Sequence, residues 1–242
     1  MSSSKTAIIT GASKGIGRAT AEALGALGFN VIINYRSNAD AAKSTAEAVV
    51  QKGGAAHIVQ ADVTKPADVA RLFTAAEDKF GGVDVVVSNA GMSVFAPLAA
   101  MSVEDFDTMF QLNARGAFLV LSEAARRVRD GGRIIHISSG GTKMPSPGGG
   151  GYAASKAAGE QMALSLAKEL GERQVTVNVV SPGVTRTEGL VLPEPALQQL
   201  VGMTPLGRLG APADVGDAIA MLKTGAARWI NGQNIQVNGG IL

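Results

Sequence analysis

The sequence holds a tyrosine and a lysine four residues apart, Tyr152 and Lys156, at the start of a segment with helical patterning. Four residues advance an α-helix by about 400°, so both side chains lie on one face, one turn apart. A phenol titrates near ~10, and lowering that pKa by about 3 units requires roughly 4 kcal/mol. A cation ~4 Å away at an effective dielectric of ~20 supplies about that much. The pair therefore indicates acid–base chemistry. The alternative, an ordinary tyrosine beside a solvated lysine, is weakened because Ser138 and Ser139 end a strand pattern shortly before Tyr152.

A glycine-rich segment, residues 10–17, joins the first strand pattern to the first helix pattern. Glycines at 11, 15 and 17 permit a tight turn and let backbone N–H groups approach a pyrophosphate, to which the helix dipole adds. The spacing is G-x-x-x-G-x-G and differs from the G-x-G-x-x-G fingerprint. Taken alone, the segment indicates a phosphate-binding loop, with a strand–helix turn that binds nothing as the alternative.

The end of the second strand pattern bears on which dinucleotide this loop would hold. A fold that prefers NAD usually places an acidic residue there, about 20 residues after the glycines, to bond the ribose hydroxyls. Here residues 34–37 read Asn-Tyr-Arg-Ser, without an acid. Arg36 can pair with a 2′-phosphate, and Lys14 can join it. We therefore expect NADP(H), preferred over NAD(H); two solvated surface cations are the alternative.

The elements that must position these residues are short β-branched runs alternating with longer helix-patterned segments. Strands are expected at residues 7–10, 31–33, 57–59, 83–87, 133–137, 175–180 and 234–237. Helices are expected at 16–27, 39–52, 66–80, 102–130, 152–171 and 212–223. Continuous apolar strands that alternate with helices predict an α/β fold, a Rossmann-type doubly wound parallel sheet of about seven strands with helices on both faces.

We see no linker or internal repeat, so we expect a single domain over residues 1–242. The least regular stretch is about 182–211, which contains four prolines. A long irregular insertion in a compact domain is more often functional than accidental. We interpret this stretch as a substrate loop.

Composition excludes several kinds of site. The 242 residues include no cysteine and two histidines, His57 and His136, which excludes disulfides, cysteine metal sites, a thiol nucleophile and a three-histidine metal site. No metal is expected, and His136 reads as a core residue of its strand. Lys+Arg 22 against Asp+Glu 20 leaves a net charge of +2, too small to indicate nucleic acid. There is no signal-peptide core and no run of 18 apolar residues, so we expect a cytoplasmic protein with no membrane association.

Nearly the whole sequence resembles the short-chain dehydrogenase/reductase family in its compact single-domain form. In chain order, the matching segments are 10–17 (TGxxxGxG), Asp62-Val63 (the adenine-contacting pair), Ser88–Gly91 (NNAG, with serine for the first asparagine), Asn113, Ser139 with Tyr152 and Lys156 (catalytic serine and YxxxK), Ser181–Thr187 (PGxxxT), Gly232 and Asn238–Gly240. Each match is modest, but their order and spacing together are specific.

The resemblance implies a catalytic set of Asn113, Ser139, Tyr152 and Lys156. Ser139 would hydrogen-bond the substrate oxygen, and Tyr152 would exchange a proton with it as hydride moves to or from nicotinamide C4. Lys156 would bond the nicotinamide ribose and lower the pKa of Tyr152, and Asn113 would hold a water that relays protons to Lys156. The implied cofactor contacts are Gly11, Ser13, Lys14, Gly15, Ile16, Gly17, Arg36, Asp62, Val63, Asn89, Ala90, Gly91, Tyr152, Lys156, Pro182, Gly183, Val184 and Thr187.

The expected pocket walls, about residues 92–97, 141–151 and 184–203, carry mainly apolar side chains. Such a lining suits a hydrophobic ketone or secondary alcohol better than a sugar. We therefore predict an NADP(H)-dependent oxidoreductase that interconverts these small molecules. The four glycines at 148–151 are either a mobile wall of this pocket or a loop filler.

Two other functions stay open. One is a 3-oxoacyl-[acyl-carrier-protein] reductase of fatty-acid synthesis, for which an acidic acyl carrier protein would dock on a basic rim. The arginines of that rim are Arg126, Arg127, Arg129, Arg133 and Arg173. Arginines that complement helix dipoles are the alternative. The other function is a dinucleotide-sensing protein without catalysis, which the intact catalytic set disfavours. The resemblance also implies a homo-oligomer, a dimer or tetramer, formed through helices 103–130 and 152–171, with residues 239–242 in a second contact.

Overall fold

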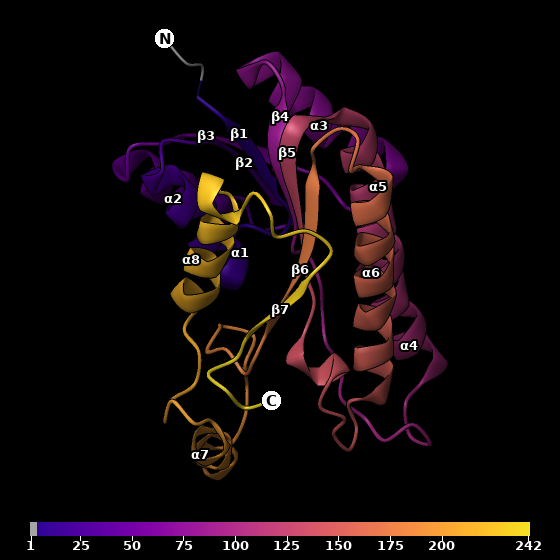
Figure 1. Cartoon of the computed structure of the whole chain (residues 1–242). Helices are drawn as coiled ribbons and strands as arrows, with labels where there is room; N and C mark the ends of the chain where they lie inside the picture. The colour runs from indigo at the N-terminus through magenta and orange to yellow at the C-terminus, as the bar shows by residue number, and fades with distance from the viewer. Residues whose placement is uncertain (1–3) are drawn as a thin grey trace.

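The structure, a computed structural model, describes residues 4–242, and its centre is a parallel sheet of seven strands (Figure 1). The strands are β1 (Thr6–Ile9), β2 (Asn30–Tyr35), β3 (Ala55–Gln60), β4 (Val83–Ser88), β5 (Val128–Ile137), β6 (Thr176–Pro182) and β7 (Asn234–Val237). Their spatial order is β3-β2-β1-β4-β5-β6-β7, and every neighbouring pair is parallel. The predicted doubly wound sheet is confirmed.

Helices cover both faces of this sheet. They are α1 (Gly15–Ala26), α2 (Ala39–Gln51), α3 (Pro66–Phe80), α4 (Val103–Phe110), α5 (Ala117–Arg127), α6 (Gly150–Glu169), α7 (Glu194–Met203) and α8 (Pro212–Leu222). Successive strand residues point to opposite faces. In β1, therefore, Ile8 packs into the core beneath α3, α5 and α6, whereas Ile9 packs into the core beneath α1, α2 and α8. Figure 1 shows these two helical layers on either side of the sheet.

Local sequence signals set several helix ends as expected. The Ser102 hydroxyl caps α4 by accepting a hydrogen bond from the Asp105 N–H at 3.0 Å. Pro66 lies in the first turn of α3, where a missing N–H costs nothing. Gly28 follows α1 with φ 77°, the left-handed region that glycine adopts without strain.

The single helix predicted over residues 102–130 is wrong. It divides into α4, a π-helical turn η1 (Gln111–Gly116), and α5, which ends at Arg127. The chain then joins the sheet, because Val128 pairs with Val83 at the start of β5, and a register shift follows before Arg133 pairs with Val85. π-Turns within helices are frequent at functional sites, and this one carries the buried Asn113.

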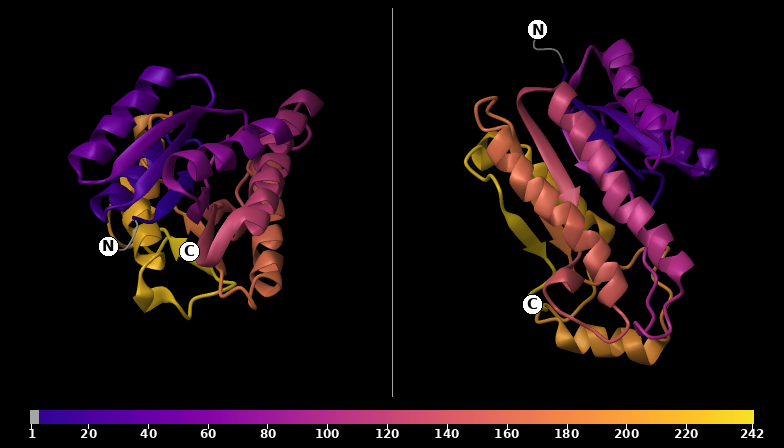
Figure 2. Two further views of the ribbon diagram at one scale, coloured as in Figure 1. Left: turned by 90° about the horizontal axis from the view of Figure 1, so that it is seen from above. Right: turned by 90° about the vertical axis from the view of Figure 1, so that its right-hand side faces the viewer.

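The irregular stretch 182–211 contains the helix α7, with Pro193 at its N-cap and Pro195 in its first turn. Figure 2 shows α7 at the end of the molecule where the strands finish. Ligands of open α/β sheets bind at the carboxyl ends of the strands. The predicted substrate loop therefore lies at the edge of the sheet where a substrate is expected.

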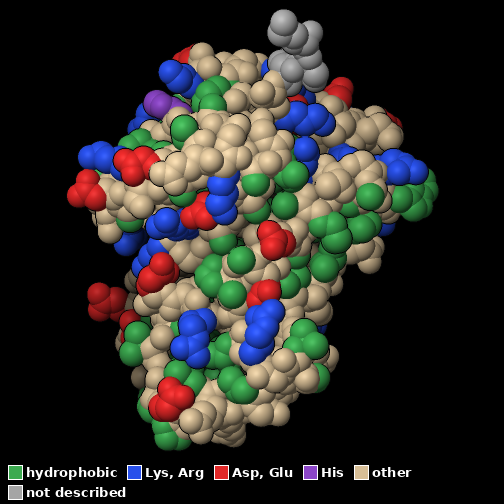
Figure 3. Space-filling view, turned by 90° about the vertical axis from the view of Figure 1, so that its left-hand side faces the viewer, with side chains coloured by type: hydrophobic (Ala, Val, Ile, Leu, Met, Phe, Trp, Pro, Cys, Tyr) green, Lys and Arg blue, Asp and Glu red, His purple; other side chains and the backbone are tan. Residues whose placement is uncertain are grey.

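Lys and Arg are interspersed with Asp and Glu on the side of the molecule that carries α2 and α8 (Figure 3). Within residues 4–242 no helix is long and apolar enough to cross a membrane. The single tryptophan, Trp229, lies between the short helix η3 (Gly225–Ala227) and β7, and it is 94% exposed.

Candidate active site

The glycine loop lies where β1 passes into α1, next to β4, at the point where the strand order reverses. Gly11 and Gly15 have φ of 63° and 55°, which favours glycine. A Cβ on Gly17 would lie 2.5 Å from the Gly11 carbonyl oxygen, so the loop can close only with glycine there. Among the described residues no side chain caps α1, and its first turn contains no acidic residue. The first N–H groups of α1 are thus available to an anion, and the loop fits a dinucleotide pyrophosphate.

Asn89, directly after β4, fixes the glycine loop. Its carboxamide donates to the Thr10 and Gly11 carbonyl oxygens at 2.8 and 3.2 Å. In return the Thr10 hydroxyl accepts from the N–H groups of Asn89 and Ala90 at 2.9 and 3.0 Å. These four hydrogen bonds attach the glycine loop to the segment that follows β4.

Asn34, at the end of β2, is a site residue that the sequence analysis passed over. Its buried side chain accepts from the Gly11 N–H at 3.0 Å and donates to the Ala61 carbonyl at 2.9 Å, so it ties the loop to β2 and β3. The sequence did contain a signal for this role, because Asn34 is a polar residue that directly follows the apolar residues 31–33 of a buried strand. Burial raises the pKa of the nearby Asp62 carboxyl, but hydrogen bonds from Thr64 and the charge of Arg36 outweigh this and hold that pKa below its usual range. Arg36 itself is exposed.

The structure brings Tyr152 and Ser139 together. Tyr152 lies in the first turn of α6, and Ser139 follows the end of β5, where its hydroxyl accepts from the Gly141 N–H at 3.1 Å. Burial raises the pKa of the Tyr152 phenol, and a hydrogen bond with the Ser139 side chain lowers it. The net direction is upward, whereas the sequence analysis expected a lowered pKa. The reason is that the effect of burial is larger than that of the Ser139 hydrogen bond. The Lys156 ammonium donates to the Ile137 carbonyl oxygen at 2.8 Å.

Lys156 and Asn113 meet beside Gly91. A Cβ on Gly91 would lie 3.0 Å from Lys156 Nζ and 3.1 Å from Asn113 Oδ1, and Gly91 itself is exposed. The Asn113 side chain also bonds both backbone groups of Met92, donating at 2.7 Å and accepting at 2.9 Å. It donates in addition to the Ser155 hydroxyl at 2.9 Å. The π-turn thus presents Asn113 to α6 and to the segment after β4.

The other predicted cofactor contacts lie along the same edge. Ser13, Lys14 and Ile16 are in the glycine loop, Asp62 and Val63 follow β3, and Pro182, Gly183, Val184 and Thr187 end or follow β6. Thr187 reaches the glycine loop, because a Cβ on Gly15 would lie 3.4 Å from its methyl group. A Cβ on Gly183 would lie 2.8 Å from Asn238 Cα, so glycine is needed where the carboxyl-terminal segment crosses.

The four glycines at 148–151 form a packing surface. The Ala96 N–H donates to the Gly148 carbonyl at 3.0 Å, and a Cβ on Gly151 would lie 2.6 Å from the Met101 sulfur. The segment 95–101 therefore packs closely against the start of α6. This contact places the Phe95 ring 5.4 Å from the Tyr152 ring, tilted by 53°, with Phe95 64% exposed.

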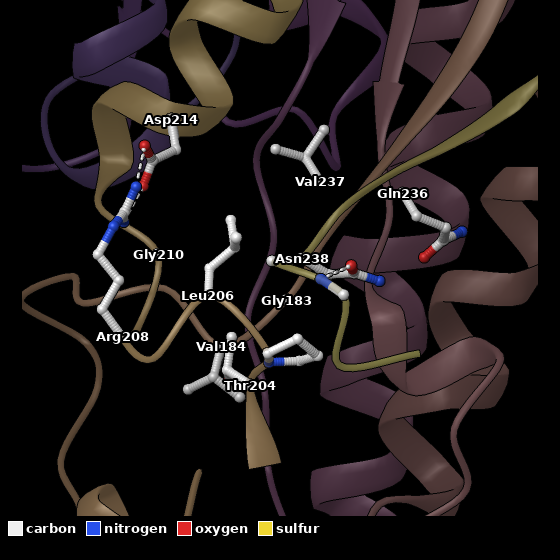
Figure 4. A pocket seen from close by; sticks show the side chains of 13 residues that line it. Gly183, Val184, Thr204, Leu206, Arg208, Gly210, Asp214, Gln236, Val237 and Asn238 are labelled. Atoms are coloured by element: carbon white, nitrogen blue, oxygen red, sulfur yellow. Dashed lines mark hydrogen bonds and ion pairs between the residues drawn. The ribbon is translucent and has the colours of Figure 1, made fainter. Parts of the chain in front are cut away.

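A cavity of about 490 Å³ lies behind the Pro182–Gly183 segment, between the end of β7 and the start of α8. Figure 4 shows Leu206 pointing into it and Arg208 paired with Asp214 at its side. That pair is bidentate, at 2.6 and 2.8 Å, and the Arg208 guanidinium lowers the pKa of Asp214 to about 2. None of the described side chains lining the cavity belongs to the catalytic set. The cavity therefore adjoins the site through Gly183 and Val184, two of the predicted cofactor contacts, and holds none of the four catalytic side chains.

The arginines of the expected basic rim lie near the amino end of β5. Tyr152 lies at the other side of the molecule, where the strands have their carboxyl ends. Arg127 pairs with Glu77 and Glu123. Arg129 pairs with Asp84 at 3.4 Å, and Arg173 with Asp130 at 2.8 Å. Arg126 also pairs with Glu123, and Arg133 donates to the Gly131 and Gly132 carbonyls. The structure does not bring these cations to the site.

Comparison with known proteins gives consistent matches. A family model described as enoyl-(acyl carrier protein) reductase matches residues 11–242. A short-chain type dehydrogenase/reductase of Picea abies is 43% identical over 98% of this chain and 92% of its own length. Tetrahydroxynaphthalene reductase PfmaG of Pestalotiopsis fici is 38% identical over 98% and 91%. The solved structure of angucycline C-6 ketoreductase LanV with bound NADP superposes with a TM-score of 0.93 at 39% identity, covering 98% of this chain and 95% of that one.

Proposed function

The chain belongs to the short-chain dehydrogenase/reductase family, and we propose that it is an NADP(H)-dependent reductase that converts a hydrophobic, ring-bearing ketone into a secondary alcohol. The observation that carries the proposal is the convergence of four side chains at the carboxyl edge of the sheet. Tyr152 lies beside Ser139, and Lys156 lies beside Asn113. The braced glycine loop lies at the same edge.

The proposed reaction adds a hydride to the carbonyl carbon and a proton to the carbonyl oxygen. A nicotinamide dinucleotide held at the glycine loop supplies the hydride. Tyr152 donates its phenolic proton to the oxygen as negative charge develops there, and the Ser139 hydroxyl donates a hydrogen bond to the same oxygen. The raised pKa of Tyr152 keeps the phenol protonated and ready to donate at neutral pH.

Lys156 lies one helical turn after Tyr152, and we assign to its positive charge the stabilisation of the phenolate that forms on Tyr152 during the reaction. Burial lowers the pKa of its ammonium to about 8, against an opposing effect of Glu160, so it still carries a proton at neutral pH. Gly91 is exposed, and the buried Lys156 Nζ and Asn113 Oδ1 lie directly beneath it. A water held there by Asn113 can return a proton to Lys156, and from there to Tyr152.

Two features support the choice of cofactor and substrate. Arg36 and Lys14 are exposed cations at the end of β2 and in the glycine loop, suited to a 2′-phosphate; the ketoreductase LanV was solved with NADP. Phe95 exposes its ring beside Tyr152, where a flat apolar substrate can stack. A relative named for tetrahydroxynaphthalene fits the same preference.

The test is oxidation of NADPH and of NADH against a carbonyl panel of aryl ketones, aliphatic ketones and β-ketoacyl thioesters. We expect NADPH with aryl ketones to give the highest kcat/KM. Tyr152→Phe should lower kcat by about 10²–10⁴-fold, because general acid catalysis is lost, while NADPH affinity stays within about 2-fold. Turnover retained in Tyr152→Phe, or no NADPH consumption with any carbonyl, would overturn the proposal.

A further inference from the structure

Glu160, on α6, is a buried carboxyl group that the proposed reaction leaves unused. It is 6% exposed. Its Oε1 atom accepts hydrogen bonds from the Ser138 hydroxyl at 2.5 Å and from the Thr142 hydroxyl at 2.6 Å. Burying a carboxyl group is costly unless it is paired and hydrogen-bonded. The buried position of the Glu160 carboxyl group therefore indicates a specific role for it.

The two hydroxyl donors lie on either side of Ser139. Ser138 follows the end of β5 and directly precedes Ser139. Thr142 is the last residue of the short helix η2 (Gly140–Thr142), which begins directly after Ser139. Both bonds lead to one oxygen atom on α6. Glu160 thus fastens the segment that carries Ser139 to the helix that carries Tyr152.

Glu160 also continues a row of functional groups along α6. Tyr152, Lys156 and Glu160 follow one another at intervals of four residues, which places them on one helix face. Lys156 therefore has the phenol one turn before it and the carboxyl group one turn after it. A negative charge at this spacing favours the charged form of Lys156.

We propose that Glu160 is a positioning residue with two effects: it holds the Ser139 segment against α6, and it places a negative charge one helical turn after the Lys156 ammonium. The consequence for turnover rests on the function proposed above. The effect on Lys156 is a property of the folded chain alone.

The charges around Lys156 give the direction of the second effect. Its titratable neighbours are Glu160 and Tyr152 on α6 and His136 on β5, and η1 faces it with the uncharged Asn113. Burial lowers the pKa of His136 to about 3, so this imidazole is neutral above that pH. The Glu160 charge raises the pKa of Lys156 against the lowering effect of burial. Removing the carboxylate must therefore lower the pKa of Lys156 further.

The experiment compares Glu160→Gln, Glu160→Asp and Glu169→Gln with the unaltered chain. Glu169 is the matched control, an exposed glutamate at the end of the same helix. The pKa of Lys156 is measured by NMR on chains with labelled lysine, with the signal assigned through Lys156→Met. The pH profile of kcat and the KM for NADPH are measured on the same variants.

In Glu160→Gln we expect the pKa of Lys156 to fall by about one unit, and the alkaline decline of kcat to move down with it. At pH 8 this corresponds to a loss of roughly 5-fold in kcat. The KM for NADPH should stay within about 2-fold. Glu160→Asp keeps the charge and shortens the reach, so its kcat should fall while the pKa of Lys156 stays near that of the unaltered chain.

A Lys156 titration in Glu160→Gln that coincides with Glu169→Gln would overturn the proposal, whether or not the protein reduces ketones. A chain that shows the Lys156 shift and consumes no NADPH would contradict the proposed function alone. If Glu160→Gln does not fold, Thr142→Val tests the positioning of the Ser139 segment instead. In this variant kcat should fall at least about 3-fold, and the pKa of Lys156 should stay unchanged. An unchanged kcat there counts against the positioning role.

Discussion

Arg36 is the residue on which the choice between the two dinucleotides depends. Its side chain is exposed after the end of β2, where an NAD-preferring fold carries an acid. A charge-assisted hydrogen bond contributes about 1.5–3 kcal/mol. We therefore expect Arg36→Ala to raise the KM for NADPH by roughly 10–100-fold and to leave the KM for NADH within about 2-fold. Steady-state kinetics with both cofactors measure this.

The control for Arg36→Ala is Lys43→Ala, which removes an exposed cation of α2 that pairs with Asp40. It should change neither KM. An equal rise for NADPH and NADH in Arg36→Ala would show that the guanidinium does not read the 2′-phosphate.

Single residues also show where sequence reasoning stopped. Tyr152 and Lys156 could be singled out because both lie on one helix, where spacing determines geometry. Asn34 and Glu160 could not, because their partners Gly11, Ser138 and Thr142 come from other elements. Glu160 nevertheless stands four residues after Lys156, and that spacing was a usable signal.

At the scale of elements, β5 and α6 hold the site together, and the contact between His136 and Gly159 sets how closely they pack. A Cβ on Gly159 would lie 2.2 Å from His136 Nε2. The imidazole is buried between β5 and α6, so it cannot move aside for an added methyl group. We expect Gly159→Ala to lower the free energy of unfolding by about 1–3 kcal/mol through overpacking. Chemical denaturation followed by circular dichroism measures the change.

Gly202→Ala is the matched control, since Gly202 lies within α7 with nothing within 4 Å of its added Cβ. Replacing glycine by alanine in an unhindered helix should raise stability by about 0.5–1 kcal/mol. If Gly159→Ala and Gly202→Ala both raise the free energy of unfolding, the contact between β5 and α6 is not tightly packed.

The regular elements could be predicted because their patterns are local. Seven apolar runs became seven strands, and Pro66 and Ser102 began helices where expected. The π-turn could not be predicted, since Asn113 is held there by Met92 and Ser155 from other parts of the chain. The early start of β5 likewise depends on pairing with Val83.

In the whole molecule, the carboxyl ends and the amino ends of the parallel strands have separate roles. The site occupies the carboxyl edge, and the arginines of the expected carrier-protein rim occupy the amino edge in ion pairs. We expect Arg129→Glu with Arg173→Glu to lower the melting temperature by several degrees, because Arg173 also donates to the Ala125 and Val128 carbonyls. The rates with carrier-bound and coenzyme A-bound β-ketoacyl thioesters should each stay within about 2-fold.

Comparing the two thioesters in that double variant separates docking from stability. A loss confined to the carrier-bound thioester would mean that a carrier protein does use this edge. Equal rates with the two thioesters would mean that Arg129 and Arg173 act only in the stability of the fold.

The exposed indole of Trp229 determines how such measurements can be made. A fluorophore that already sees water in the native chain emits much as it does after denaturation, so its emission is a poor signal for unfolding. The same exposure makes it a sensitive probe of self-association. If a second copy covers this margin of the sheet, the emission maximum will move to shorter wavelength as protein concentration rises, and no dye needs to be attached.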